Sequence, residues 1–219
     1  MSKPIYICFE GLDGSGKSTL YQKVFSRLRI LGYNVQGLCP TKSTCNCPDK
    51  NSCTCHSIER LFNRHPRFHK SRFLRMFLYA YRSNQTASHI DWNADIILGD
   101  RSLVTSYICR WTRSKALNSV LVHIVNLLEY KIPSPDFIIY LDVPFMELEK
   151  RLRIRGNQDI DEKDVRAKAM KFAYDTLINN PSTVKRISNA KWIVVNGNQS
   201  EDFVFDDTMK QISIILSED

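Results

Sequence analysis

A glycine-rich motif near the start of the chain constrains the fold more than any other feature of the sequence. Residues 11–18 read Gly-Leu-Asp-Gly-Ser-Gly-Lys-Ser and match the pattern G-x-x-x-x-G-K-[ST] at every fixed position. The apolar run at residues 5–9 predicts a buried strand before the motif. Apolar residues at helical spacing follow from Lys17, and Gly32 stands where a glycine would close that helix. A strand, a glycine-rich loop and a helix in this order predict a phosphate-binding loop (P-loop).

Each residue type in the motif suits a chemical task. Glycines let successive backbone N–H groups converge on a polyphosphate, and the amino terminus of the helix adds its positive dipole. Lys17 is expected to reach the β- and γ-phosphates, and the Ser18 hydroxyl to ligate Mg²⁺. A glycine-rich turn that arose by chance is the alternative. We expect ATP to bind along the motif, at Gly11, Gly14, Ser15, Gly16, Lys17, Ser18 and Thr19.

The rest of the chain alternates apolar runs with helical patterns. Residues 34–39 look like a second strand, and short apolar runs predict further strands near residues 95–99, 137–141 and 192–195. Helical spacing predicts helices over about residues 73–81, 117–129, 145–155 and 162–178, and a last helix ending near residue 216. This alternation predicts a three-layer α/β fold, in which helices cover both faces of a parallel sheet. We expect residues 1–219 to form a single domain with a Cys-rich insertion at 40–57.

An acidic and a basic residue follow the strand expected at 95–99. Asp100 and Arg101 thus stand at the carboxyl end of a parallel strand, where ligands of open α/β sheets bind. Asp100 is suited to hold Mg²⁺ or its water shell, and Arg101 to clamp an acceptor phosphate through two hydrogen bonds. A structural pair at the strand end is the alternative. No Asn-Lys-x-Asp segment follows a later strand, so the sequence favours a small-molecule kinase over a switch GTPase.

Three arginines lie close together in the second half of the chain. Arg151, Arg153 and Arg155 precede a glycine, and acidic residues follow. A mobile basic lid over about residues 151–162 would need this composition, because phosphoryl transfer depends mainly on positioning and charge neutralisation. A solvated amphipathic helix would carry the same charges.

Together these segments resemble the thymidylate kinase family of P-loop nucleoside monophosphate kinases. The resemblance covers most of the chain and is carried by residues 9–19, 78–82, 99–101 with Ser106, 135–144 and 151–156. It implies a Mg²⁺-dependent P-loop kinase that moves the γ-phosphoryl group of ATP onto a nucleoside monophosphate, with dTMP as the first expectation. A different nucleoside monophosphate, or a nucleoside, is the alternative acceptor.

The resemblance also implies roles for single residues. Asp13 matches the P-loop acid that contacts the acceptor's sugar hydroxyl, and Arg82 matches an arginine that contacts the acceptor base or phosphate. Gly14 stands where one branch of the family has a P-loop arginine, so the catalytic positive charge is expected from the lid. The implied catalytic residues are Lys17, Asp13, Arg101, Arg153 and Arg155, with Arg151 on the ATP side. The implied acceptor-binding residues are Asp13, Arg82, Asp100, Arg101 and Ser106.

Two departures from the family pattern concern the acceptor. The family's Arg-Glu-Pro-Gly, which supports the acceptor phosphate, is replaced by Leu-Cys-Pro-Thr at residues 38–41. Where a Gln often helps to read thymine, this chain has Arg110 or its neighbours. Specificity needs particular polar partners in the acceptor pocket, so the sequence alone leaves the identity of the base open.

Four cysteines lie in the segment that replaces the expected acceptor loop. Cys45, Cys47, Cys53 and Cys55 form a C-x-C-x₅-C-x-C pattern with His56 beside it. Four thiolates suit a closed tetrahedral Zn²⁺ site, although the spacing is tighter than that of paired C-x-x-C knuckles. Disulfide or redox-responsive pairs, and a loop of reduced thiols, are the alternatives.

A formal net charge of +8 indicates anionic partners. Basic residues between Arg60 and Arg82 alternate with phenylalanines, as on a nucleic-acid surface, but their helical spacing favours a solvated face. A nucleic-acid or protein-binding module with a regulatory P-loop is therefore the second hypothesis. The chain shows neither a long apolar run nor a signal-peptide pattern, so we expect a cytoplasmic enzyme without membrane contact. Proteins of this fold commonly dimerise, which leaves a homodimer open.

Overall fold

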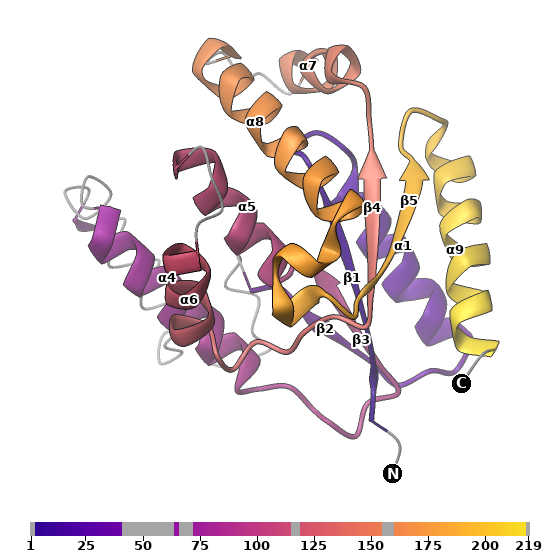
Figure 1. Ribbon diagram of the computed structural model, residues 1–219. Helices are drawn as coiled ribbons and strands as arrows, with labels where there is room; N and C mark the ends of the chain where they lie inside the picture. Colours follow the sequence, from indigo (N-terminus) through magenta and orange to yellow (C-terminus); the bar gives the residue numbers. More distant parts are fainter. Residues whose placement is uncertain (1–2, 41–63, 66–71, 115–118, 155–159, 218–219) are drawn as a thin grey trace.

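Five parallel strands form one sheet in the order β2-β3-β1-β4-β5 (Figure 1). The computed structural model describes residues 3–40, 64–65, 72–114, 119–154 and 160–217. The strands are β1 (Ile5–Gly11), β2 (Val35–Leu38), β3 (Ile96–Asp100), β4 (Phe137–Asp142) and β5 (Lys191–Asn196). The predicted parallel sheet is confirmed, and β1, which leads into the P-loop, lies at its centre.

Helices cover both faces of the sheet. The first face is packed by α1 (Lys17–Ile30) and α9 (Glu201–Ser217), which lie side by side. Toward the second face lie α4 (Arg72–Ala87), α5 (Leu103–Ser114), α6 (Ser119–Leu128), α7 (Phe145–Ile154), α8 (Ile160–Asn179) and the 3₁₀ turns η1 (Pro181–Thr183) and η2 (Lys185–Ile187). The three-layer arrangement expected from the sequence is therefore present, and it is consistent with a P-loop kinase fold.

Side chains of β1 alternate between two hydrophobic cores. Tyr6 and Cys8 pack with α5 and α8, whereas Ile7 and Phe9 pack with α1 and α9. All four side chains are buried, because a strand covered on both faces has no solvent-facing side. Burial of this kind contributes about 1.5–3 kcal/mol for each large apolar side chain. The two cores hold the central strand, and with it the start of the P-loop, in a fixed place.

Helix α5 was not predicted from the sequence. It follows β3 almost directly, and its core-facing residues Leu103, Val104, Tyr107 and Ile108 do recur at helical spacing. Its β-branched and hydroxyl residues weaken the helical signal. Among the other helices, α4 continues to Ala87, beyond the predicted end at residue 81, and α8 ends at Asn179, next to the predicted end at residue 178. Residues 41–57 of the predicted insertion and 155–159 of the predicted lid lie outside the described residues.

Within the part of the chain that the structure describes, no helix combines the length and the apolar character that crossing a membrane requires.

Candidate active site

The P-loop runs from the carboxyl end of β1 to the amino terminus of α1. Gly14 and Gly16 have φ angles of 88° and 93°, in the left-handed region that favours glycine. A Cβ atom on Gly14 would also lie 3.3 Å from the side chain of Leu152 on α7. Gly16 is the N-cap of α1, so the first free N–H groups of that helix face the loop. This geometry provides the anion cradle that the motif predicts.

Lys17 lies inside this cradle. Its side chain is only 6% exposed, and its ammonium donates a hydrogen bond to the backbone oxygen of Leu12 at 2.9 Å. The same Nζ atom is 3.8 Å from the carboxylate of Asp13. Burial, together with the nearby charge of Arg101, lowers the pKa of Lys17 to about 8. An incoming polyphosphate would favour the charged form of this ammonium.

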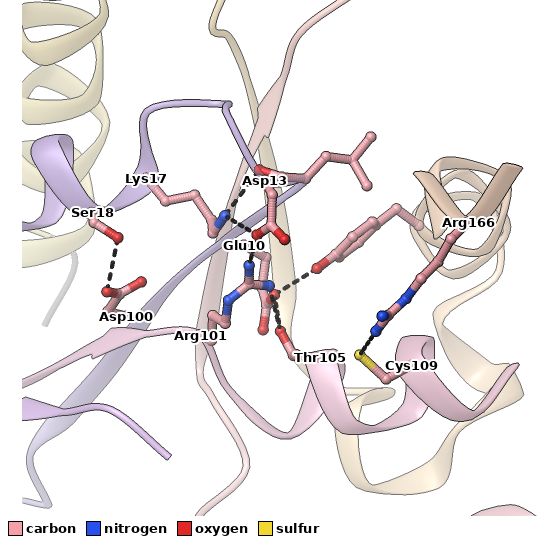
Figure 2. Close-up of polar contacts among 11 residues, drawn as sticks. Glu10, Asp13, Lys17, Ser18, Asp100, Arg101, Thr105, Cys109 and Arg166 are labelled. Atoms are coloured by element: carbon pink, nitrogen blue, oxygen red, sulfur yellow. Dashed lines mark hydrogen bonds and ion pairs between the residues drawn. The ribbon is translucent and has the colours of Figure 1, made fainter. Parts of the chain in front are cut away.

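Arg101 crosses from the end of β3 to the P-loop. Its guanidinium forms an ion pair with Asp13 and donates a hydrogen bond to the hydroxyl of Thr105 at 3.4 Å (Figure 2). Partial desolvation raises the pKa of Asp13, but Arg101 and Lys17 outweigh it, so the net pKa lies below its ordinary value. The Asp13 side chain is 76% exposed, which leaves the Arg101 guanidinium open to competition from another anion.

Ser18 and Asp100 bring two oxygen ligands together. The Ser18 hydroxyl donates to the Asp100 carboxylate at 3.1 Å, and Asp100 is buried at the carboxyl end of β3 (Figure 2). The described residues contain no group of three or more His, Cys, Asp or Glu side chains that would hold a metal ion by itself. Mg²⁺ usually takes one or two protein ligands together with phosphates and water, so this pair fits Mg²⁺ bound with a nucleotide.

A pocket of about 290 Å³ opens on the other side of the P-loop. It is lined by Gly14, Ser15, Gly16 and Thr19, by Arg151 of α7, and by Gly197 and Gln199 after β5. Arg151 donates hydrogen bonds to Glu147 at 2.8 Å and to the backbone oxygen of Gly197 at 3.1 Å. Arg151 thereby joins α7 to the loop that follows β5, at the rim of the pocket.

The remaining predicted site residues lie in three different settings. Arg153 pairs with Glu149 on the exposed side of α7 and is 62% exposed. Arg82, on α4, has its guanidinium 5.0 Å from the ring of Tyr79. Ser106 donates to the carboxylate of Glu129 at 2.7 Å. Outside the described parts of the chain lie Arg155, Cys45, Cys47, Cys53 and Cys55, together with the side chain of Arg110.

Two features of the site were missed by the sequence reasoning. Glu10, directly before the P-loop, is fully buried and accepts hydrogen bonds from α5 and α8. Its signal was a carboxylate at the end of an otherwise apolar run. Gly197 and Gln199 follow β5, and their signal was the carboxyl end of a parallel strand.

Sequence comparisons relate the chain to known proteins. A family model described as thymidylate kinase matches residues 9–207. The chain is 25% identical over 223 residues to the thymidylate kinase of Mycoplasma capricolum subsp. capricolum, covering 98% of this chain and 97% of that protein. It is 29% identical over 175 residues to a probable thymidylate kinase of Sulfurisphaera tokodaii, covering 78% of this chain and 80% of that protein.

Proposed function

The chain belongs to the thymidylate kinase family, and on that premise we propose how its residues transfer the γ-phosphoryl group of ATP to dTMP. The activity, conversion of dTMP to dTDP, follows from membership of the family. The assignment of residues is supported by one observation above all. Lys17, Arg101 and the Ser18–Asp100 pair converge on the P-loop from two neighbouring strands (Figure 2).

ATP binds with its phosphates in the P-loop cradle and its remainder toward the 290 Å³ pocket. Backbone N–H groups of residues 14–19 and the Lys17 ammonium hold the β- and γ-phosphates. Arg151 and the loop at Gly197 line this pocket, which supports a role for Arg151 on the donor side. Arg153 and Arg155 supply positive charge from the lid, as the family resemblance implies.

The acceptor phosphate binds at Arg101. It displaces the exposed Asp13 carboxylate from the guanidinium, and Asp13 is then available to the sugar hydroxyl of the acceptor. Arg82, Asp100 and Ser106 complete the proposed acceptor side. Transfer itself needs no general base, because the attacking acceptor oxygen is already ionised at neutral pH. A bond forms between that oxygen and the γ-phosphorus, the bond from the γ-phosphorus to the β–γ bridging oxygen breaks, and ADP leaves with the electron pair.

Ser18 and Asp100 are the residues that would hold Mg²⁺. When bound there, the ion neutralises charge on the β- and γ-phosphate oxygens. Lys17 approaches the donor phosphates and Arg101 the acceptor phosphate, so positioning and charge compensation account for the proposed catalysis.

A coupled phosphotransfer assay across deoxy- and ribonucleoside monophosphates and nucleosides tests this function. We expect dTMP to be the best acceptor and activity to require Mg²⁺. A chain that phosphorylates nucleosides but no nucleoside monophosphate would contradict the proposal. A salt-dependent shift of DNA or RNA without phosphotransfer would favour the binding-module hypothesis instead.

Three further properties stay predictions. We propose a single kinase domain spanning residues 1–219, a structural Zn²⁺ at Cys45, Cys47, Cys53 and Cys55, and a homodimer. Metal analysis of the purified protein, with and without a Cys45→Ser and Cys47→Ser double change, tests the zinc. Sedimentation at several protein concentrations tests the dimer.

A further inference from the structure

Glu10 is a buried carboxylate for which the proposed mechanism has no role. It is the residue before Gly11 and has no solvent exposure. One carboxylate oxygen accepts the backbone N–H and the hydroxyl of Ser102, both at 2.8 Å. The other accepts the hydroxyls of Thr105 and Tyr174, also at 2.8 Å. These four neutral donors come from the start of α5 and from α8, and they meet where β1 enters the P-loop.

The backbone next to Glu10's partners is strained at one residue. Arg101 has a φ of 74° and is the only described residue other than glycine with a positive φ. Its own N–H donates to the backbone oxygen of Phe9 at 3.0 Å, and the next N–H, that of Ser102, donates to Glu10. Strained conformations persist where the surrounding structure over-determines them, and they cluster at functional sites. Phe9 and Glu10, at the end of β1, therefore fix the backbone both at Arg101 and at the residue that follows it.

Glu10 also reaches the Arg101 side chain through one intermediate. Thr105 donates to Glu10 at 2.8 Å and accepts from the Arg101 guanidinium at 3.4 Å (Figure 2). The four groups that donate hydrogen bonds to Glu10 are all neutral, so none of these hydrogen bonds is an ion pair. Burial lowers the pKa of Lys17, and Glu10 is one of the carboxylates that oppose this change.

We propose that Glu10 is a positioning residue, which fixes the strained Arg101 backbone through Ser102 and aims the Arg101 guanidinium at the acceptor phosphate through Thr105. This inference rests on the proposed role of Arg101. Tyr174 extends the same arrangement to α8, the helix that follows the lid, so the phosphate-binding loop, the acceptor arginine and α8 share one buried carboxylate.

A purely structural role is the competing account, and the chain offers a matched carboxylate for comparison. Asp136 lies just before β4 and accepts the backbone N–H of Tyr6 at 2.9 Å, near the other end of β1. It joins the start of β1 to the residue before β4, whereas Glu10 joins the end of β1 to α5 and α8. Asp136 thus lies at the end of the sheet opposite to the P-loop. Asp136→Asn removes this carboxylate charge and its ion pair with Lys3 at 3.0 Å, while an amide oxygen can still accept the Tyr6 N–H. The variant therefore measures what the loss of such a charge does to stability without disturbing Arg101.

The deciding experiment is a double-mutant cycle between Glu10→Gln and Arg101→Ala, with kcat/KM for the acceptor as the readout. In Glu10→Gln the amide oxygen can still accept the Ser102 N–H, and the amide nitrogen can donate to the Thr105 and Tyr174 hydroxyls. We expect a loss of about tenfold in kcat/KM for the acceptor in the wild-type background, and less than about twofold when Arg101 is already alanine. Asp136→Asn should leave kcat/KM within about twofold.

Equal losses in the two backgrounds would overturn the proposal, as would full activity of Glu10→Gln. If Glu10→Gln does not fold, Thr105→Val takes its place in the same cycle, because it removes the link between the carboxylate and the guanidinium. The cycle uses whichever nucleotide the wild-type chain phosphorylates best. If the acceptor assignment is wrong, the acceptor profile of the wild-type chain will show it. If the role of Glu10 is wrong, Glu10→Gln will change kcat/KM by the same factor in both backgrounds.

Discussion

The two sides of the P-loop are built in different ways. The donor side combines the backbone of Gly14, Gly16 and Gly197 with larger side chains, among them Arg151 and Gln199, around one pocket. The acceptor side is a network of charged and hydroxyl side chains, in which Arg101 contacts Asp13 and Thr105, and Thr105 contacts the buried Glu10. Backbone can present N–H groups to any polyphosphate, whereas side chains at fixed positions can distinguish one acceptor from another. The difference suggests that generic donor binding and selective acceptor binding are separated across one loop.

The largest expected effect concerns the residue that both sides share. Lys17 is expected to contact the donor phosphates and also lies 3.8 Å from Asp13 on the acceptor side. Lys17→Ala should lower kcat by about a thousandfold or more, because the negative charge on the transferred phosphoryl group loses its nearest cation. Thermal unfolding should show that the variant stays folded, since the change removes a buried charge. Retained full activity would refute the role of Lys17 in transfer.

Backbone geometry on the donor side gives the next effect. Gly14→Ala should reduce the free energy of unfolding by about 1–3 kcal/mol, because a side chain there is strained and also meets Leu152. Gly32→Ala is the matched control, since Gly32 has a φ of 96° but no atom within 4 Å of an added Cβ. Urea unfolding should show a larger loss for Gly14→Ala than for Gly32→Ala. Equal losses would mean that the contact with α7 does not constrain the loop.

The lowered pKa of Lys17 predicts a pH dependence of ATP binding. Below a pH of about 8 the ammonium is charged with or without ATP, so the affinity should be nearly constant. Above that pH the free enzyme loses the proton and ATP binding must restore it, so the affinity should fall by up to about tenfold per pH unit. Calorimetry in two buffers should detect proton uptake on binding at about pH 9. A flat affinity in this range would contradict the prediction.

A conservative change provides the control for this titration. Lys17→Arg keeps a cation whose pKa lies far above the range tested, so its ATP affinity should not fall between about pH 8 and pH 9. If the arginine variant shows the same decline as the wild-type chain, another group is titrating.

The contrast between the two sides also explains what could be predicted from the sequence. The strands, most helices and the P-loop depend on local patterns, so they could be located by periodicity and one motif. The Ser18–Asp100 contact could be predicted, because both residues were expected at the carboxyl edge of the sheet. The hydrogen bond between Tyr174 and Glu10 could not be predicted, because the two residues are separated by 164 positions and only the packing of α8 brings them together. Helix α5 was not predicted for a local reason, since its hydroxyl and β-branched residues weaken the helical pattern.

The division into donor and acceptor sides is tested most directly by comparing Arg101→Ala with Arg151→Ala. Both changes remove one arginine that hydrogen-bonds a neighbouring side chain, but Arg101 pairs with Asp13 and Arg151 borders the pocket beside Gly197. Steady-state kinetics should be measured with each substrate varied in turn. We predict that Arg101→Ala lowers kcat/KM for dTMP by about a hundredfold and changes KM for ATP by less than about twofold. We predict that Arg151→Ala raises KM for ATP by about tenfold and leaves kcat/KM for dTMP unchanged. Losses shared equally between the two substrates in both variants would contradict the account.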